Sequence, residues 1–158
     1  DISPLQQMSS NMLEKDVFLF DIEPTVKWKT LPEHVYAYNN FNGESAETGV
    51  VVNYYLKEDR PADVTVEVYQ GNVMINEIAG QDSAGLHRVV WNMDKRRKRS
   101  KEEMERLKKR LEGWRDLRES DYYERLPVPP GEYEVILKVD DIEVRKEAVI
   151  LKDEWYLK

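Results

Sequence analysis

The side chains of this sequence best suited to chemistry are its two histidines, which can act as general bases near neutral pH. His34 follows Pro32 in a loop-like segment, and His87 lies in a segment that alternates like a strand. Neither accompanies a serine in a Gly-x-Ser-x-Gly turn, and the 158 residues include no cysteine. Because nucleophilic catalysis needs a nucleophile beside its base, we expect structural or surface roles for both histidines and predict no catalytic residue.

The 31 acidic residues are numerous enough to supply the paired carboxylates of a glycosidase site. Asp59, Asp63, Asp140 and Asp141, however, lie in predicted turns, where aspartate commonly bonds to the backbone. The sequence has no histidine pair at i,i+4 spacing, no Asp-x-Asp-x-Asp-Gly loop and no phosphate-binding glycine loop. We therefore predict no metal and no cofactor, with a calcium site at Asp140 and Asp141 as the alternative.

A run of five cations, Lys95–Arg99, is the strongest electrostatic feature of the sequence. Residues 94–125 contain 13 basic and 9 acidic residues, a net charge of +4, while the remainder has 11 and 22, a net charge of −11. An acidic remainder repels a polyanion, so we predict no nucleic-acid partner. We interpret the run as a solvated lead-in to a helix. An acidic protein partner, or contact with the acidic part of the chain itself, is the alternative.

Period-two alternation of apolar residues predicts several half-buried strands. The predicted strands are Val50–Leu56, Val64–Tyr69, Val73–Ile78, Leu86–Trp91, Tyr133–Val139 and Ile142–Ile150. Trp91 shares a face with His87 and Val89, and we expect it to point inward. Short connections at 70–72 and 140–141 are typical of hairpins. This pattern predicts a mainly β, antiparallel sandwich of two sheets, and no apolar run reaches the roughly 18 residues of a membrane span.

The basic block has the composition of a helix inserted between strands. Ser100 and Glu103 form a capping-box pattern, which predicts a helix start and a helix over about residues 100–119. Four apolar residues recur at spacings of 3, 4 and 3, an amphipathic seam made of Met104, Leu107, Leu111 and Trp114. Gly113 disfavours helix, so the helix could fray beyond Leu111. We expect part of this seam to overhang the sandwich and to contact another surface.

Six stretches of the sequence are informative when taken together: Asp1–Gln7, Asp16–Pro24, Asn40–Glu44, Asn53–Lys57, Gly85–Met93 and Val128–Tyr133. They resemble the end of a bacterial sortilin-type (Asp-box repeat) β-propeller and the immunoglobulin-like domain that follows it. The family's usual form of the fifth stretch is closer to Gly-Leu-Asn-Arg-Val-Val-Trp-Asp-Leu, so His87 and Asn92 are departures. The resemblance covers almost the whole chain except about residues 95–125. It implies a fold similar to the small sandwich of the flagellar hook-capping protein and of some secretion-sorting domains.

Together, the alternation and the resemblance predict the domain organisation. Residues 1–34 are expected to be a propeller-derived linker, partly because Phe18, Phe20 and Trp28 need burial that the predicted sandwich does not supply. Residues 35–152 are expected to form the immunoglobulin-like sandwich, with the helical insert at 95–125 and a C-terminal tail at 153–158.

The resemblance also implies an extracytoplasmic protein, secreted, periplasmic or at the cell surface, in which any hydrolytic activity belongs to the propeller. We therefore expect a non-catalytic accessory domain that docks on, or presents, an upstream β-propeller or another protein. The seam Met104, Leu107, Leu111 and Trp114 is the predicted docking face. The alternative is a carbohydrate-binding module, because sugar rings stack on exposed aromatics, with Tyr122, Tyr123 and Trp155 as the candidate residues.

Overall fold

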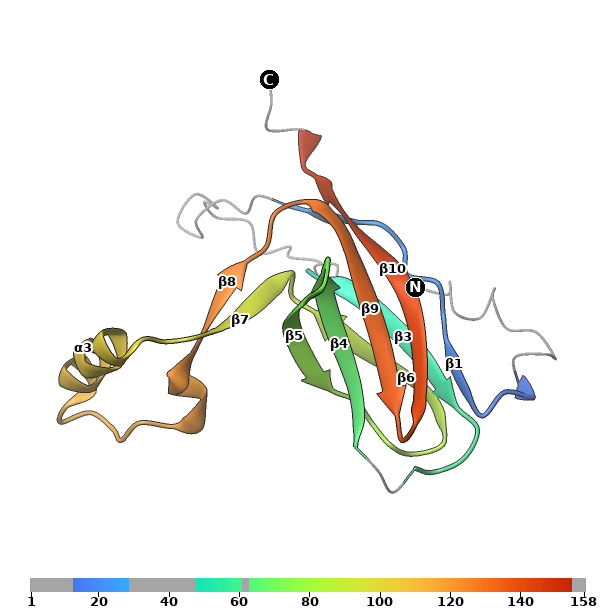
Figure 1. The fold of residues 1–158 in the computed structure, drawn as a ribbon, viewed down its shortest axis with the longest axis horizontal. Coiled ribbons are helices and arrows are strands. Elements are labelled where there is room, and N and C mark those ends of the chain that lie inside the picture. Colours follow the sequence, from blue (N-terminus) through green and yellow to red (C-terminus); the bar gives the residue numbers. More distant parts are fainter. Residues whose placement is uncertain (1–12, 29–47, 61–62, 155–158) are drawn as a thin grey trace, which may run out of the picture.

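The computed structural model describes residues 13–28, 48–60 and 63–154, and Figure 1 shows their arrangement. The elements follow the order β1 (Val17–Leu19), β2 (Thr25–Lys27), β3 (Val50–Leu56), β4 (Val64–Gln70), β5 (Val73–Ala79), β6 (Gly85–Trp91), β7 (Asp94–Lys98), α3 (Lys101–Leu111), the 3-10 helix η2 (Glu119–Tyr122), β8 (Tyr123–Pro127), β9 (Gly131–Val139) and β10 (Ile142–Lys152). The described chain is mainly β, with α3 inserted between β7 and β8. This confirms the predicted fold class.

Two sheets form the body of the molecule, which we call the sandwich. Sheet A has the strand order β1-β3-β6, and sheet B has the order β2-β10-β9-β4-β5. Among the described strands, β2 pairs with β10 in parallel, whereas the other pairs are antiparallel. The sandwich is thus antiparallel, as predicted, except at the β2 edge of sheet B.

The core lies between the two sheets because alternate residues of each strand point inward. The inward side chains of β3 and β4 are almost completely buried: Val50, Val52, Tyr54, Leu56, Val64, Val66 and Val68. Trp91 of sheet A is 0% exposed and packs edge-on against Tyr133 of sheet B, with ring centroids 5.1 Å apart. The inward orientation predicted for Trp91 is confirmed, and the pair joins the two layers.

The sandwich extends further toward the N-terminus than the predicted start at residue 35. Val17 of β1 lies opposite Leu56 in sheet A, and Val26 of β2 lies opposite Leu151 in sheet B. Of the three aromatic residues expected to need burial, Phe20 is 1% exposed and Phe18 is half-buried, whereas Trp28 is 57% exposed. The pairing partners of β1 and β2 lie in β3 and β10, which are distant in the chain, and local alternation does not reveal such pairing. The propeller-derived origin of residues 1–34 stays a prediction.

Both predicted tight hairpins occur. Gln70 pairs with Val73 around Gly71 and Asn72, and Gly71 has a φ of +59° that glycine adopts without steric cost. Val139 pairs with Ile142 around Asp140 and Asp141, where Asp140 has a φ of +52°. Aspartate tolerates this left-handed conformation better than most residues, so the second hairpin forms without the usual glycine.

Residues 94–127 leave the sandwich as a projection that we call the arm (Figure 1). β7 and β8 pair as a two-stranded antiparallel ribbon, with Asp94 opposite Pro127 and Lys98 opposite Tyr123. The ribbon carries α3 and η2 at its far end, away from the two sheets (Figure 1). The predicted insert at 95–125 therefore corresponds to a structured ribbon with a helical tip.

Candidate interaction site

Hydrogen bonds to buried residues fix the base of the arm. The Trp91 indole donates from Nε1 to the carbonyl of Asp94 at 2.7 Å. Asn76 of β5 donates from Nδ2 to Asp94 Oδ1 at 2.7 Å and to the Asp94 carbonyl at 3.2 Å. At the other end of the arm, the Val128 amide donates to the carbonyl of Met93 at 2.9 Å. Because both ends are tied to the core, the ribbon leaves the sandwich in a defined direction.

Charged pairs within the arm stabilise the ribbon. Arg97 donates from Nη2 to Glu103 Oε1 at 2.7 Å and to Glu124 Oε2 at 2.5 Å. Arg99 Nη1 lies 3.5 Å from Glu124 Oε1. These two acceptors raise the pKa of Arg97 above its ordinary value, first through the hydrogen bond to Glu103 and then through that to Glu124. The ribbon therefore uses part of the cationic run for its own cohesion.

This arrangement corrects the interpretation of Lys95–Arg99 as a lead-in to a helix. Residues 95–98 are solvent-exposed as expected, but they belong to strand β7. A run of like charges has no apolar alternation, and the pairing partner, β8, lies about 30 residues further along the chain. The contact between the cations and the chain's own sandwich, left as an alternative, is not observed: none of the ion pairs among the described residues joins an arm cation to a sandwich carboxylate.

Helix α3 begins at the predicted capping box. The Glu103 amide donates to Ser100 Oγ at 3.2 Å, and the Ser100 amide donates to Glu103 Oε2 at 2.7 Å. This exchange satisfies two backbone donors that a helix start otherwise leaves without partners. The hydrogen bond from Arg97, together with that from the Ser100 amide, lowers the pKa of Glu103 to about 2. The same carboxylate thus joins the ribbon to the first turn of the helix.

The helix is shorter than the predicted span of about 100–119. It ends at Leu111, because Glu112 leaves the helical conformation, with a φ of −56° and a ψ of 126°, and Gly113 has a φ of +81°. A left-handed glycine after the last turn is a common helix terminator. Beyond it, Arg115 donates to both oxygens of Asp121, from Nη1 to Oδ2 at 2.6 Å and from Nη2 to Oδ1 at 2.9 Å. That pair closes a loop which returns the chain to β8.

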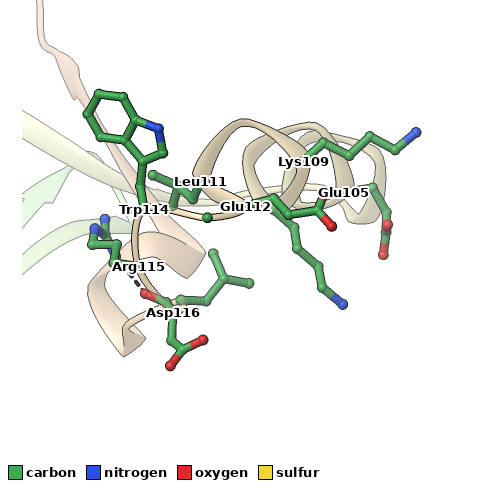
Figure 2. A pocket seen from close by; sticks show the side chains of 10 residues that line it. Glu105, Lys109, Leu111, Glu112, Trp114, Arg115 and Asp116 are labelled. Atoms are coloured by element: carbon green, nitrogen blue, oxygen red, sulfur yellow. Dashed lines mark hydrogen bonds between the residues drawn. The ribbon is translucent and has the colours of Figure 1, made fainter.

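The predicted seam lies at the far end of the arm, away from the sandwich (Figure 1), and is only partly covered. None of the residues of α3 is buried; Met104, Leu107 and Leu111 are half-buried, and Trp114, which lies past the helix end, is 89% exposed. Leu111 and Trp114 line a shallow hollow of about 640 Å³ at the tip of the arm. Figure 2 shows the two side chains side by side, with Lys109 and Glu105 further along the helix. The structure thus presents a small apolar surface at the end of a stalk.

Two of the three residues predicted for glycan stacking, Tyr122 and Tyr123, lie within the described part of the chain. Tyr122 is 45% exposed. The ring of Tyr123 is covered by the Arg96 guanidinium, whose central carbon lies 3.9 Å from the ring centroid. A ring face that carries a guanidinium is not available to a sugar. Trp155 lies outside the described residues. The carbohydrate-binding alternative stays a prediction, which rests on Tyr122 within the described chain.

His87 and Asp140, which were considered for catalysis and metal binding, make contacts that stabilise the fold. His87 is buried, with Nδ1 2.9 Å from Gln81 Oε1 and Nε2 2.5 Å from the Ser83 carbonyl, and it tethers the loop between β5 and β6. Asp140 Oδ2 lies 3.6 Å from Arg60 Nη1. His34 lies outside the described residues. Within residues 13–28, 48–60 and 63–154, no group of three histidine or acidic side chains is arranged to hold a metal ion.

Comparison of the chain with models of protein families, with curated proteins and with solved structures found no match. The resemblance to domains that follow sortilin-type propellers therefore stays a prediction. In the described part of the chain, no helix has the length and apolar character needed to cross a membrane.

Proposed function

We propose that this chain is a non-catalytic interaction domain, an accessory to a larger extracytoplasmic β-propeller protein. The arm is its docking element, and the contact surface consists of Met104, Leu107, Leu111 and Trp114. One observation carries this proposal: an apolar surface stands on a stalk that is fixed to the core, with Trp114 89% exposed and the other three side chains only partly covered.

A partly exposed apolar stripe at the end of a projection is unfavourable in a free domain, because the uncovered apolar area stays in contact with water. Burying it against a partner would regain roughly 25 cal/mol for each Å² removed from water. Amphipathic helices commonly bind partners by placing such a stripe in an apolar groove. The anchored base favours this use, because a directed stalk loses less conformational freedom on docking than a flexible one.

The test is the double substitution Leu107→Glu with Leu111→Glu. Both side chains are only half-buried, so the sandwich should keep its melting temperature while docking on the propeller of the parent polypeptide is lost. The matched control is Lys101→Gln with Arg106→Gln, which lowers the net charge by the same two units at exposed positions of α3 that lie outside both the stripe and the hollow. Calorimetric titration of the separately expressed propeller with each variant measures the difference.

Two results would count against the proposal. Equal affinity of the double variant and the control would remove the docking role of the stripe. A native polypeptide without a propeller before residue 1 would remove the accessory role, although not the docking role of the arm.

A further inference from the structure

The outer face of sheet B is rich in carboxylates. The residues of its strands that point away from the core include six glutamates: Glu67, Glu77, Glu132, Glu134, Glu143 and Glu147. The cations on the same face are Lys138 and Arg145. This face therefore carries a net charge of −4 (two positive and six negative side chains), which makes it the acidic counterpart to the basic arm.

The carboxylates of this face are placed unfavourably for an isolated domain. Glu134 lies directly opposite Glu147, and Glu67 lies directly opposite Glu77. Like charges in directly opposed cross-strand positions destabilise a sheet. Arg145 reaches Glu134 at 3.3 Å, but Glu147 has no ion-pair partner among the described residues.

The other carboxylates of this face are also only partly neutralised by cations. Lys138 Nζ lies 3.0 Å from Glu67 Oε1 and 3.5 Å from Glu143 Oε1. Glu77 and Glu132 are exposed and, like Glu147, have no ion-pair partner in the part of the chain that the structure describes. Three exposed carboxylates without an ion-pair partner in the described chain thus lie on the outer face of the sheet.

One face of the arm's ribbon has the opposite charge. Because side chains alternate along a strand, Arg96 and Lys98 of β7 share a face with Arg125 and Tyr123 of β8. Arg96 lies directly opposite Arg125, which is again a like-charge pair. Arg125 Nε is 3.8 Å from Asp94 Oδ2 at the base of the arm, whereas Glu124 lies on the other face with Arg97. This surface, Arg96, Lys98 and Arg125, is the cationic ribbon face.

We propose that the outer face of sheet B binds the cationic ribbon face of a second copy of this chain. The two surfaces are opposite in charge, and each has a directly opposed like-charge pair, Glu134 with Glu147 on the sheet and Arg96 with Arg125 on the ribbon. The contact cannot form within one copy, because the ribbon starts beside β5 and points away from the sandwich (Figure 1). A two-fold exchange of arms makes the contact twice, which is the commonest way for a homo-oligomer to close.

This inference goes beyond the proposed function, since it uses the ribbon and sheet B and leaves the stripe on α3 free for another partner. It predicts a dimer whose dissociation constant rises about tenfold or more between 20 and 300 mM NaCl, because screening weakens exposed charge pairs. Sedimentation equilibrium of the full chain over a range of concentrations measures this constant.

Charge reversal provides the specific test. Arg96→Glu with Lys98→Glu reverses the ribbon face, and Glu132→Lys with Glu147→Lys reverses the sheet face. Each double variant alone is expected to be monomeric, and an equimolar mixture of the two should regain a heterodimer, because both contacts are then again between opposite charges. All four positions are exposed, so folding should be retained, as circular dichroism would verify. The matched control, Lys108→Glu with Lys109→Glu on α3, changes the charge of the arm equally and should leave the dimer intact.

The inference is overturned if the chain is monomeric at all concentrations in 20 mM NaCl, or if the mixture of reversed variants does not associate. Its failure can be told from that of the proposed function. Leu107→Glu with Leu111→Glu leaves the ribbon–sheet dimer within about twofold, whereas the Glu132→Lys, Glu147→Lys variant leaves docking through α3 unchanged.

Discussion

Arg115 and Asp121 hold the far end of the arm together through two parallel hydrogen bonds, at 2.6 and 2.9 Å. Asp121 Oδ2 also accepts from the Arg118 amide at 2.8 Å. These donors, first Arg115 and then the Arg118 amide, hold the pKa of Asp121 well below its usual range. The loop that displays Trp114 is thus ordered by one bidentate ion pair, without any buried core of its own.

Asp121→Asn should therefore loosen the tip of the arm without affecting the sandwich. A neutral amide has one oxygen in place of two charged ones, so it cannot accept from both guanidinium nitrogens and from the backbone amide. We expect faster hydrogen exchange at the Arg118 amide and no change in the melting temperature. Asp116→Asn is the control, because Asp116 takes part through its carbonyl and not through its carboxylate. Equal exchange rates in the two variants would contradict the role of the pair.

The start of α3 should respond to acid. The pKa of Glu103 is about 2 in the folded arm against an ordinary value of 4.5, so its carboxylate stabilises the arm fully above pH 4.5. As the pH falls toward 2, this contribution is lost, because the protonated acid no longer accepts from Arg97 as an anion. Carbon-13 NMR of the Glu103 carboxyl should titrate near pH 2, and the amide signals of residues 100–104 should move with it.

The variant Glu103→Gln isolates this effect. It should lose the pH dependence of the first helical turn between pH 4.5 and 2, and it should resemble the wild type at the acid end of that range. A wild-type Glu103 that titrates near 4.5 would show that the contact with Arg97 is not formed in solution.

The two tryptophans at the ends of the arm should differ sharply in their effect on stability. Trp91 is 0% exposed and donates to the Asp94 carbonyl, so Trp91→Phe leaves a cavity and removes a buried hydrogen bond. We expect a loss of about 2–4 kcal/mol in the free energy of unfolding, measured by urea denaturation. Trp114→Phe, at 89% exposure, should stay within about 0.5 kcal/mol of the wild type. Similar losses in both variants would mean that the tip of the arm is packed in solution.

Local patterns were sufficient to predict the elements that depend on near neighbours in the chain. Alternating valines and tyrosines predicted β3, β4, β9 and β10, and the hairpin at Asp140–Asp141 joins adjacent strands. The capping box at Ser100 and Glu103 predicted the start of α3, because its two hydrogen bonds span three residues. The pattern of four seam residues was visible too, although the helix stops at Leu111 and Trp114 lies past its end.

The sequence alone determines a two-layer β structure with an amphipathic helix. The reason is that the alternation of apolar residues and the helix cap each depend on residues that are close together in the chain. Tertiary structure decided where β1 and β2 pair, and it turned the cationic run into a strand of a projecting ribbon. The physical reason is that Lys95–Arg99 has no apolar preference of its own. Its conformation depends on hydrogen bonds to β8 and on carboxylates such as Glu124, which are distant in the chain and become neighbours only on folding.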